Sequence, residues 1–380
     1  MRIVTLILIT LCAIILSLFV VSFLNDKTMK QIPAESVMTR GVSKEKPTEF
    51  IGFLPYWNAN PLFPVYGSYF SHIMYFGVTV DARGRVVTSG PEWSVINSSY
   101  VFDLMQGLDK KKTKLSLVVK QFDGDIINKF ISDADAGARL SSDLINLVDQ
   151  FNLDGINFDF EFDGSTQSLD REKFVLFIEE VSLALRKENP NIILSFDLSG
   201  QIIEKEKSYD LEKIGKVMDF VIIMGYDYKT PSSPFAGPVA PILGEANEHT
   251  ISEAVAFVSS KIPSDKIVLG MPLYGYEWET KDATFKSSAA ANSGAIASYS
   301  RSSKILKDNK TITLQWDEKA MSPWFAYKVD GVTRQIYFEN EESLIAKLKF
   351  AQEMNLKGAA FWALGYEGDN EALWKKLAGN

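Results

Sequence analysis

Eight short apolar runs recur along the chain from residue 49 onward, and stretches with helical spacing separate them. An intervening stretch such as AGARLSSDLINLVDQFN places its apolar residues one helical turn apart and ends in a loop signal. The runs are EFIGFLPYW, HIMYFGVTV, KLSLVVKQF, GINFDFEF, NIILSFDLS, MDFVIIMGYDY, KIVLGMPLYGYEW and GAAFWALGYE. Eight strand–helix alternations predict an α/β fold of the closed (β/α)8 type, the TIM barrel, in preference to an open doubly wound sheet.

One long interval, from Glu277 to Lys357, breaks this rhythm between the seventh and eighth runs. It contains TITLQWDEKA and PWFAYKVDGVTRQIYFEN, in which Asp330 and Gly331 form a D-G turn signal. We therefore expect a small α+β insertion at about residues 277–340, within a barrel domain that covers residues 49–380.

The first 24 residues differ in kind from the rest of the chain. The segment from Ile3 to Leu24 carries no charge, and at about 1.5 Å per residue it is long enough to cross a hydrocarbon core of about 30 Å. A cleaved signal peptide would have a shorter apolar stretch and an A-x-A exit, which is lacking here. We expect residues 1–24 to form a transmembrane helix, as an anchor or an uncleaved signal, and residues 25–48 to form a polar linker.

Composition and charge exclude several classes of function. With 380 residues, of which 46% are hydrophobic, the chain can bury a large core. Its 48 acidic and 40 basic residues give a net charge of −8, so no nucleic-acid partner is expected. One cysteine, Cys12, and two histidines, His72 and His249, exclude an intramolecular disulfide, a Cys/His zinc site and most histidine-based triads. The chemistry is left to carboxylates, tyrosines or a cofactor.

The fourth apolar run, within FNLDGINFDFE at residues 151–161, alternates two kinds of side chain. Its polar members are Asn157, Asp159 and Glu161, and its apolar members are Phe158, Phe160 and then Phe162. In a parallel barrel one face of each strand meets the helices and should be apolar, whereas the other points into the barrel. The polar face should therefore point inward, with Glu161 nearest the end where barrel active sites lie. A solvated edge strand is the alternative, and the apolar opposite face disfavours it.

Two carboxylates directed into the mouth of a barrel indicate glycoside hydrolysis. Retaining and inverting glycosidases place their two carboxyls on opposite sides of the scissile bond, about 5–5.5 or 6.5–9.5 Å apart. Asp159 and Glu161 share one strand face at a backbone separation of about 6.6 Å, so they approach the sugar from the same side. One can protonate the leaving oxygen, but the other is poorly placed to attack. We therefore expect the nucleophile to be the carbonyl oxygen of the substrate's 2-acetamido group.

Four segments resemble glycoside hydrolase family 18, the chitinases and their relatives. DGINFDFE at residues 154–161 is similar to the family's D-G-x-D-x-D-x-E signature, and MGYDY at residues 224–228 to its M-x-Y-D at the end of strand six. KIVLGMPLYGYEW resembles the seventh strand and GAAFWALG the eighth. The resemblance covers about residues 49–376. It implies a TIM-barrel hydrolase of N-acetylglucosamine-containing glycans, with neither a cofactor nor a metal.

The resemblance also implies a role for each matching residue. Glu161 matches the general acid/base, which needs a raised pKa in a partly dry site. Asp159 matches the residue that orients the acetamide N–H and stabilises the positive oxazolinium ion. Tyr226 matches the tyrosine whose hydroxyl donates to the acetamide carbonyl.

Further residues match the sugar pocket rather than the reacting groups. Met224 and Asp227 match pocket residues, and Trp362 matches the tryptophan beneath the sugar ring, with an ordinary core tryptophan as the alternative. Other aromatics could line additional sugar subsites or belong to the core, and the sequence leaves both readings open: Tyr274, Trp278 and Trp324.

The chain departs from the family pattern at three places. Asn157, which we expect to be a pocket residue, stands where many chitinases carry aspartate. Asp159 therefore lacks a carboxylate partner with which to share a proton. The amide of Asn157 can still form a hydrogen bond with Asp159. Similar asparagine-bearing patterns occur in spore-cortex and cell-wall lytic members, which favours peptidoglycan or soluble oligosaccharides over crystalline chitin. The predicted third strand has VVKQF where chitinases often have S-x-G-G. The seventh run has Y-G-Y, ending at Tyr276, where Y-G-R is common in the family.

Two functions of different classes follow from these residues. The first is a monomeric, membrane-anchored, extracytoplasmic β-N-acetylglucosaminidase or chitinase that acts with retention, or a secreted one if the N-terminal segment is cleaved. The second is a non-hydrolytic chitinase-like lectin that binds cell-surface glycans. Lectin-like members commonly lose the acid, whereas Glu161, Asp159 and Tyr226 are all present. A third, a protein-binding barrel on a membrane stalk, has only the linker in its favour.

Overall fold

The computed structural model describes residues 49–59, 66–161, 170–205 and 207–379. The expected membrane segment at residues 1–24, the linker at residues 25–48 and Phe162 lie outside these ranges, so the expectations about them stay predictions. Within the described ranges, no helix has both the length and the apolar character that crossing a membrane requires.

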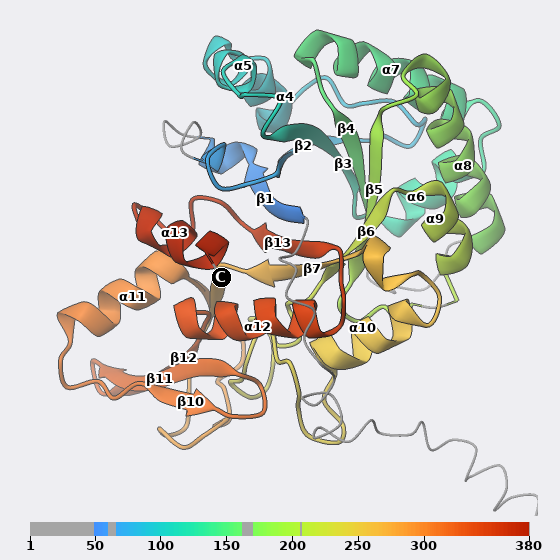
Figure 1. Ribbon diagram of the computed structural model, residues 1–380. Coiled ribbons are helices and arrows are strands. Elements are labelled where there is room, and N and C mark those ends of the chain that lie inside the picture. The colour runs from blue at the N-terminus through green and yellow to red at the C-terminus, as the bar shows by residue number, and fades with distance from the viewer. Residues whose placement is uncertain (1–48, 60–65, 162–169, 206, 380) are drawn as a thin grey trace, which may run out of the picture. The chain divides into compact units, whose positions relative to one another are not determined.

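Eight parallel strands close into a barrel, and each of the eight apolar runs contains one of them (Figure 1). Neighbouring strands follow the order β1-β13-β7-β6-β5-β4-β3-β2 around the barrel. Their bounds are β1 (Glu49–Pro55), β2 (His72–Thr79), β3 (Lys114–Gln121), β4 (Gly155–Phe160), β5 (Ile193–Ser199), β6 (Phe220–Met224), β7 (Ile267–Pro272) and β13 (Gly358–Trp362). The predicted (β/α)8 barrel is therefore confirmed.

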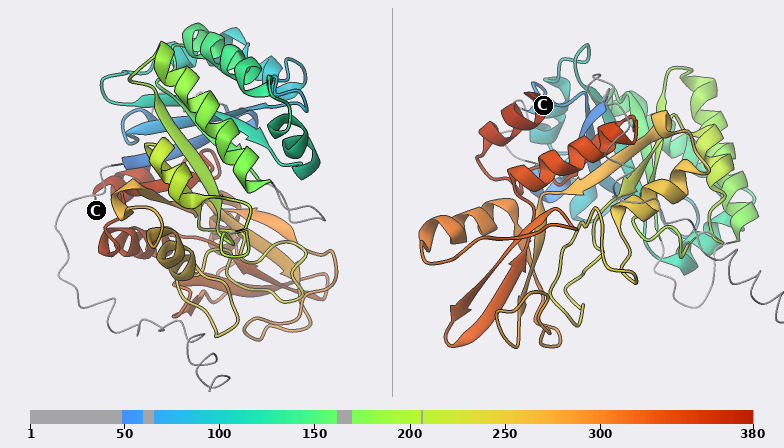
Figure 2. Two further views of the ribbon diagram at one scale, coloured as in Figure 1. Left: turned by 90° about the vertical axis from the view of Figure 1, so that its right-hand side faces the viewer. Right: turned by 60° about the horizontal axis from the view of Figure 1, so that its bottom comes forward.

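Helices connect the strands and cover the outside of the barrel (Figure 2). Several begin at a polar residue whose side chain accepts a hydrogen bond from the first turn, as Asp123, Asp170 and Thr250 do. The helices are α4 (Pro91–Ile96), α5 (Ser99–Gln106), α6 (Gly124–Ile131), α7 (Ala136–Phe151), α8 (Arg171–Glu188), α9 (Leu211–Val217), α10 (Ile251–Ser259), α12 (Glu341–Glu353) and α13 (Glu371–Gly379), with short 3-10 turns η1 (Tyr56–Asn58) and η2 (Ser264–Lys266).

The two faces of β4 separate as its alternating pattern predicts. Phe158 and Phe160 are fully buried in the core between strands and helices, where Phe160 packs against Phe130 of α6 with ring centroids 5.6 Å apart. Asn157 and Asp159 lie on the opposite, inward face. A second apolar cluster fills the barrel interior beneath them and consists of Ile51, Phe53, Met74, Phe76, Val118, Phe220, Ile222, Val268 and Ala360.

The interval between β7 and β13 folds into a five-stranded sheet of its own, in the order β10-β11-β12-β8-β9. Its elements are β8 (Tyr274–Glu279), β9 (Ala295–Ser298), α11 (Tyr299–Asp308), β10 (Gln315–Asp317), β11 (Ser322–Val329) and β12 (Val332–Tyr337). Asp330 and Gly331 join β11 to β12 with positive φ angles of 52° and 82°, as a two-residue hairpin turn requires. The expected α+β insertion is thus present, and its sheet pairs antiparallel throughout.

The run KIVLGMPLYGYEW forms two strands, although the sequence pattern treats it as the seventh barrel strand alone. β7 ends at Pro272, and the N–H of Leu273 donates to the carbonyl of Trp362 at 2.7 Å. From Tyr274 the chain leaves the barrel as β8 and pairs antiparallel with β12 and β9. Gly275 permits this path because a Cβ there would lie 1.8 Å from the carbonyl oxygen of Tyr337. Residues 267–278 are nearly all buried in both strands, so a hydrophobic pattern does not show where the barrel ends.

Candidate active site

Carboxyl groups gather at the C-terminal ends of β4, β5 and β6. Asp159 and Glu161 come from β4 and the residue that follows it, Asp197 comes from β5, and Asp227 follows β6. Asp159 and Asp197 are only 4% and 3% exposed, whereas Glu161 and Asp227 are half-buried. The N–H of Glu161 donates to the carbonyl of Gln121 at 3.0 Å, so the strand ladder extends to the residue expected to be the acid.

Asn157 lies below these carboxyls, fully buried and bonded to β5. Its amide nitrogen donates to Oδ2 of Asp197 at 2.7 Å, and its amide oxygen accepts from the hydroxyl of Ser195 at 2.6 Å. The polar inward face predicted for β4 thus continues on β5, a neighbour that the sequence reasoning did not consider. The signal was available, since Asp197 is the one charged residue of the run NIILSFDLS.

Burial and like charge act together on the two deepest carboxyls. Burial raises the pKa of Asp159 well above its ordinary value, the negative charges of Glu161 and Asp197 raise it further, and Lys120 and Lys205 partly oppose these effects. Burial likewise raises the pKa of Asp197, against the hydrogen bond from Asn157. Within the described part of the chain, Oδ1 of Asp159 and Oδ1 of Asp197 have no hydrogen-bond partner. Such groups are typical of functional sites.

Glu161 has the environment that a general acid needs. Burial raises its pKa, Lys205 lowers it, and the negative charge of Asp227 raises it again. A raised pKa keeps a carboxyl protonated to higher pH, which is the form that can transfer a proton.

Tyrosines from the insertion hold Asp227 in place. Its Oδ1 accepts hydrogen bonds from the hydroxyls of Tyr274 at 2.6 Å and Tyr276 at 2.7 Å, both on β8. Its φ of 61° is left-handed, a conformation that aspartate adopts more readily than most residues. Tyr226, one residue earlier, is half-buried, and burial followed by the nearby aspartates raises the pKa of its phenol well above the usual range. The hydroxyl of Tyr226 therefore stays protonated and can donate.

Three of the aromatics left open between core and subsite are buried in the structure. Tyr274 is buried with its hydroxyl committed to Asp227, and Trp278 is fully buried with Nε1 donating to the carbonyl of Thr230 at 3.2 Å. Trp324 is also buried and stacks on Tyr337 at 5.4 Å. All three pack in the core shared by barrel and insertion, and a sugar-subsite role for them stays a prediction.

Other aromatics line the mouth on the side of β1 to β3. Trp362 is the last residue of β13 and is half-buried, as is Met224, the last residue of β6. The ring of Trp362 packs edge-on against Phe76, with centroids 4.8 Å apart, and against Trp57, with centroids 6.2 Å apart. Trp57 is 48% exposed, and Phe122, which stacks on Phe76 at 6.5 Å, is 46% exposed. The sequence analysis did not single out Trp57 and Phe122, although each is the last residue of a predicted strand run.

Lys120 adds a positive charge to the same wall. Its position on β3 pairs with Asp159 on β4, so both side chains point inward. Its ammonium donates to Oγ1 of Thr79 at 2.9 Å and to Oε1 of Glu92 at 3.1 Å. This lysine lies in VVKQF, the segment that departs from the family pattern.

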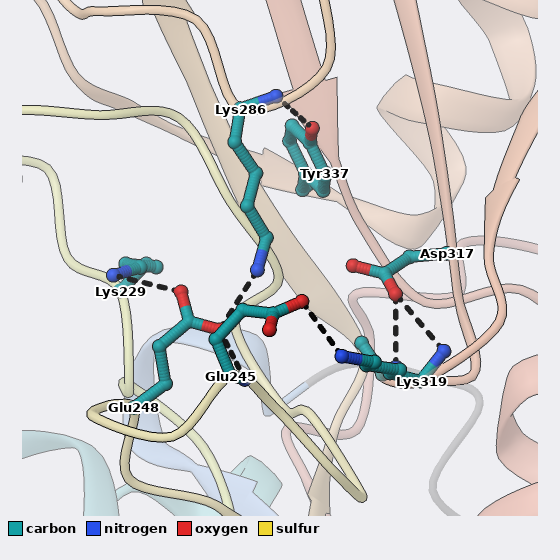
Figure 3. A network of polar contacts seen from close by, with 8 residues as sticks. Lys229, Glu245, Glu248, Lys286, Asp317, Lys319 and Tyr337 are labelled. Carbon is teal, nitrogen blue, oxygen red and sulfur yellow. Dashed lines mark hydrogen bonds and ion pairs between the residues drawn. The ribbon is translucent and has the colours of Figure 1, made fainter.

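An ionic network ties the loop that follows Asp227 to the insertion (Figure 3). Glu248 pairs with Lys229 at 3.6 Å and with Lys286 at 2.8 Å. Lys319, whose backbone N–H donates to Asp317, pairs with Glu245 at 2.9 Å. The insertion thereby supports the loop in addition to supplying the two tyrosines that hold Asp227. Among the described residues, no three His, Cys, Asp or Glu side chains are arranged so that they could hold a metal ion.

The comparisons with known proteins agree with this geometry. The family model described as glycosyl hydrolases family 18 matches residues 49–367. The uncharacterized glycosylase YvbX of Bacillus subtilis is 28% identical over 284 residues, which cover 70% of this chain and 75% of the relative. The cortical fragment-lytic enzyme of Bacillus subtilis is 24% identical over 268 residues, which cover 68% of this chain but only 58% of that enzyme.

Solved structures show the same fold. The Group IV chitinase of Ostrinia furnacalis matches with a TM-score of 0.76 at 19% identity and covers 88% of this chain and 99% of its own. The spore cortex-lytic enzyme SleL of Bacillus megaterium matches with a TM-score of 0.70 at 22% identity, over 88% of this chain and 75% of its own. Since the family model also spans the barrel from β1 to the residues after β13, the chain belongs to glycosyl hydrolases family 18.

Proposed function

We propose that the protein hydrolyses β-1,4 bonds of N-acetylglucosamine-containing glycans, with the substrate's own acetamido group as the nucleophile. The observation that carries this proposal is the placement of Asp159 and Glu161, two residues apart on the inward side of one strand, with Tyr226 at the end of β6. The carboxyls approach a sugar from one side, as substrate-assisted cleavage requires.

Each of these three residues has a physical reason for its role. Glu161, with its raised pKa, protonates the leaving oxygen and later activates water. Asp159 accepts the acetamide N–H and offsets the positive charge of the oxazolinium ion. The phenol of Tyr226 donates to the acetamide carbonyl and fixes its direction of attack.

The remaining carboxyls near the mouth are poor nucleophiles. Asp197 is almost completely buried and is bonded to Asn157, and Oδ1 of Asp227 already accepts two tyrosine hydroxyls. Among the described residues, therefore, the geometry offers neither the second carboxylate of a conventional retaining enzyme nor the base of an inverting one.

The expected substrate is an extended glycan, either a chitin oligosaccharide or peptidoglycan. Trp362 at the end of β13, exposed Trp57 against it, and exposed Phe122, which stacks on Phe76, provide apolar faces on which several sugar rings can pack. The Bacillus relative named as a cortical fragment-lytic enzyme favours peptidoglycan, and the plant relatives named as Nod factor hydrolase and class V chitinase favour chitin-like chains.

Product analysis tests the proposal directly. The purified full-length protein would be incubated with chitin oligomers and with purified peptidoglycan, and products would be followed by mass spectrometry and early proton NMR. We expect the β-anomer at the new reducing end and inhibition by a thiazoline mimic of the oxazolinium ion at concentrations well below KM. Substrates with glucose at the cleaved position should not react.

Three outcomes would contradict the proposal. An initial α-anomer or a covalent glycosyl adduct on a side chain would exclude the acetamido nucleophile. Glycan binding without any product would instead favour the chitinase-like lectin.

We further propose that residues 1–24 anchor the barrel to a membrane, with the catalytic domain as an extracytoplasmic monomer. The support is the uncharged segment from Ile3 to Leu24. Recovery of the protein in the membrane fraction, its accessibility to external protease and its mass by light scattering in detergent would test this arrangement. Release of a shortened chain into the medium would indicate cleavage and a secreted enzyme.

A further inference from the structure

Asp197 and Asp159 stand side by side on neighbouring parallel strands. The register of β4 and β5 pairs Asn157 with Ser195 and Phe158 with Phe196, and its next step places Asp159 beside Asp197. Adjacent strands lie about 4.7–4.9 Å apart, and paired residues of parallel strands point to the same face. Two nearly buried carboxyls therefore share the wall of the barrel at one height.

Each of these carboxyls has an oxygen without a partner. Asn157 donates to Oδ2 of Asp197, and Oδ1 of Asp197 and Oδ1 of Asp159 remain unbonded within the described part of the chain. Two buried acceptors next to each other are unfavourable if both are charged. One proton held between them satisfies both oxygens, because a protonated carboxyl becomes a donor.

We propose that Asp197 is a positioning residue that holds one proton in common with Asp159, and that it supplies from β5 the carboxyl which position 157 lacks on β4. Asn157 then orients the pair. Since Ser195 donates to its amide oxygen, its amide nitrogen is directed at Oδ2 of Asp197, which leaves Oδ1 of Asp197 for Asp159. We expected Asp159 to lack a carboxyl partner because position 157 on β4 is an asparagine. In the folded protein this partner comes from β5 instead.

The charged and titratable groups around the pair agree with a single shared proton. Glu161 and Tyr226 act on it from the residues that follow β4 and β6, Lys120 acts on it from β3, and Lys205 and Tyr209 lie on the segment after β5; Asp227 is linked to the pair through Glu161 and Tyr226. Burial, reinforced by neighbouring carboxylates, raises the pKa of both aspartates, which opposes loss of the last proton. The pair then carries one negative charge beneath the proposed oxazolinium ion, and this catalytic consequence rests on the proposed function.

The decisive variant is Asp197→Asn, which keeps the shape and a donor but removes a titrating group. Asp197→Asn leaves no second carboxyl to ionise, so the step at raised pH in which the pair passes from one negative charge to two should vanish, and with it the limb of the kcat/KM profile that reports this step. Asp197→Ala should lower kcat by about 10- to 100-fold with little change in KM, because Asp159 and Asn157 each lose a partner. Ser195→Ala is the matched control, since it disturbs Asn157 and keeps both carboxyls, and it should keep the limb that reports loss of the shared proton.

A swap variant tests whether the two positions are equivalent. Asn157→Asp combined with Asp197→Ala returns a carboxyl to β4, and its kcat should exceed that of Asp197→Ala by about tenfold or more. A kcat no higher than that of Asp197→Ala would contradict the equivalence.

Carbon-13 NMR of the aspartate carboxyls, recorded without substrate, separates this inference from the proposed function. In the wild type, two carboxyl signals should titrate together above the ordinary range, and Asp197→Asn should remove one and move the other to lower pH. This result stands even if the protein cleaves no glycan, in which case only the proposed function fails. An unchanged titration of Asp159 in Asp197→Asn, or two independent titrations near ordinary aspartate values in the wild type, would overturn the shared proton.

Discussion

Glu339 and Asp159 are both carboxyl groups buried inside the fold, but the charges around them have opposite signs. Glu339, which precedes α12, is fully buried 2.8 Å from the equally buried ammonium of Lys347 and accepts a hydrogen bond from Ser322 at 3.2 Å. Burial raises the pKa of Glu339, but Lys347 and the hydroxyl groups all act to lower it. At Asp159, burial and the nearest carboxylates act in the same direction.

This contrast separates a structural charge from a functional one. At the junction of insertion and barrel, the fold neutralises a buried carboxylate with an opposite charge, as stability requires. At the mouth, acids gather, and within the described ranges two of their oxygens have no hydrogen-bond partner, which costs stability and is typical of groups that exchange protons. Both carboxyl groups are buried, and the sign of the charge beside each distinguishes them: a positive charge lies beside Glu339 and negative charges lie beside Asp159.

The largest effect should come from removing the transferable proton at the mouth. Glu161→Gln should lower kcat by two to four orders of magnitude, about the contribution of general acid catalysis, because the amide keeps shape and a donor but cannot transfer a proton. Oligosaccharide binding, measured by calorimetry, should remain close to wild type. Retention of more than about a tenth of the activity would show that Glu161 is not the acid.

Breaking the pair at the structural site should cost stability rather than activity. Lys347→Met leaves Glu339 buried without a partner and should lower the free energy of unfolding by about 3–5 kcal/mol, measured by urea denaturation. Lys304→Met, which breaks the exposed pair with Asp308 on α11, is the control and should change stability little.

A double change sharpens the same point. Lys347→Met combined with Glu339→Leu should recover most of the lost stability, because it removes the unpaired charge. If the double variant were no more stable than Lys347→Met, packing rather than charge would explain the loss.

The paired aspartates should affect stability with a definite sign in pH. Their folded pKa values are raised, so between the unfolded value of about 4 and the raised folded values the native protein binds more protons than the unfolded chain. Stability contributed by these groups is present below about pH 4 and is lost as pH rises through the folded pKa values. Asp159→Asn combined with Asp197→Asn should therefore gain stability relative to wild type as pH increases. Thermal unfolding from pH 4 to 8 measures this, and a constant difference would contradict it.

The smallest effect is expected at position 157. Asn157→Asp should keep kcat/KM within about tenfold of wild type and move the acid limb of the pH–rate profile upward, because a third carboxyl adds like charge beside Asp159 and Asp197. An acid limb in the wild-type place would show that position 157 does not communicate electrostatically with Asp159.

The sequence by itself determined the eight-stranded barrel and the inward direction of the polar residues on β4. Both are local consequences of periodicity, since strands alternate their faces and helices repeat every few residues. The D-G turn of the insertion hairpin was predictable for the same reason. Local patterns also place Glu161 at the functional end of its strand.

Only the tertiary structure decided which carboxyls meet. Asp197 lies next to Asp159 because two strands far apart in the chain pair in one register, and a pattern within one strand carries no information about the register of the next. Asp227 is held by tyrosines of β8, a strand that the sequence pattern merges with β7. Whether an aromatic ring is open, as at Trp57, or buried, as at Trp278, depends on what packs over it. Contacts of this kind arise from the closing of the barrel, and hydrophobic periodicity does not encode them.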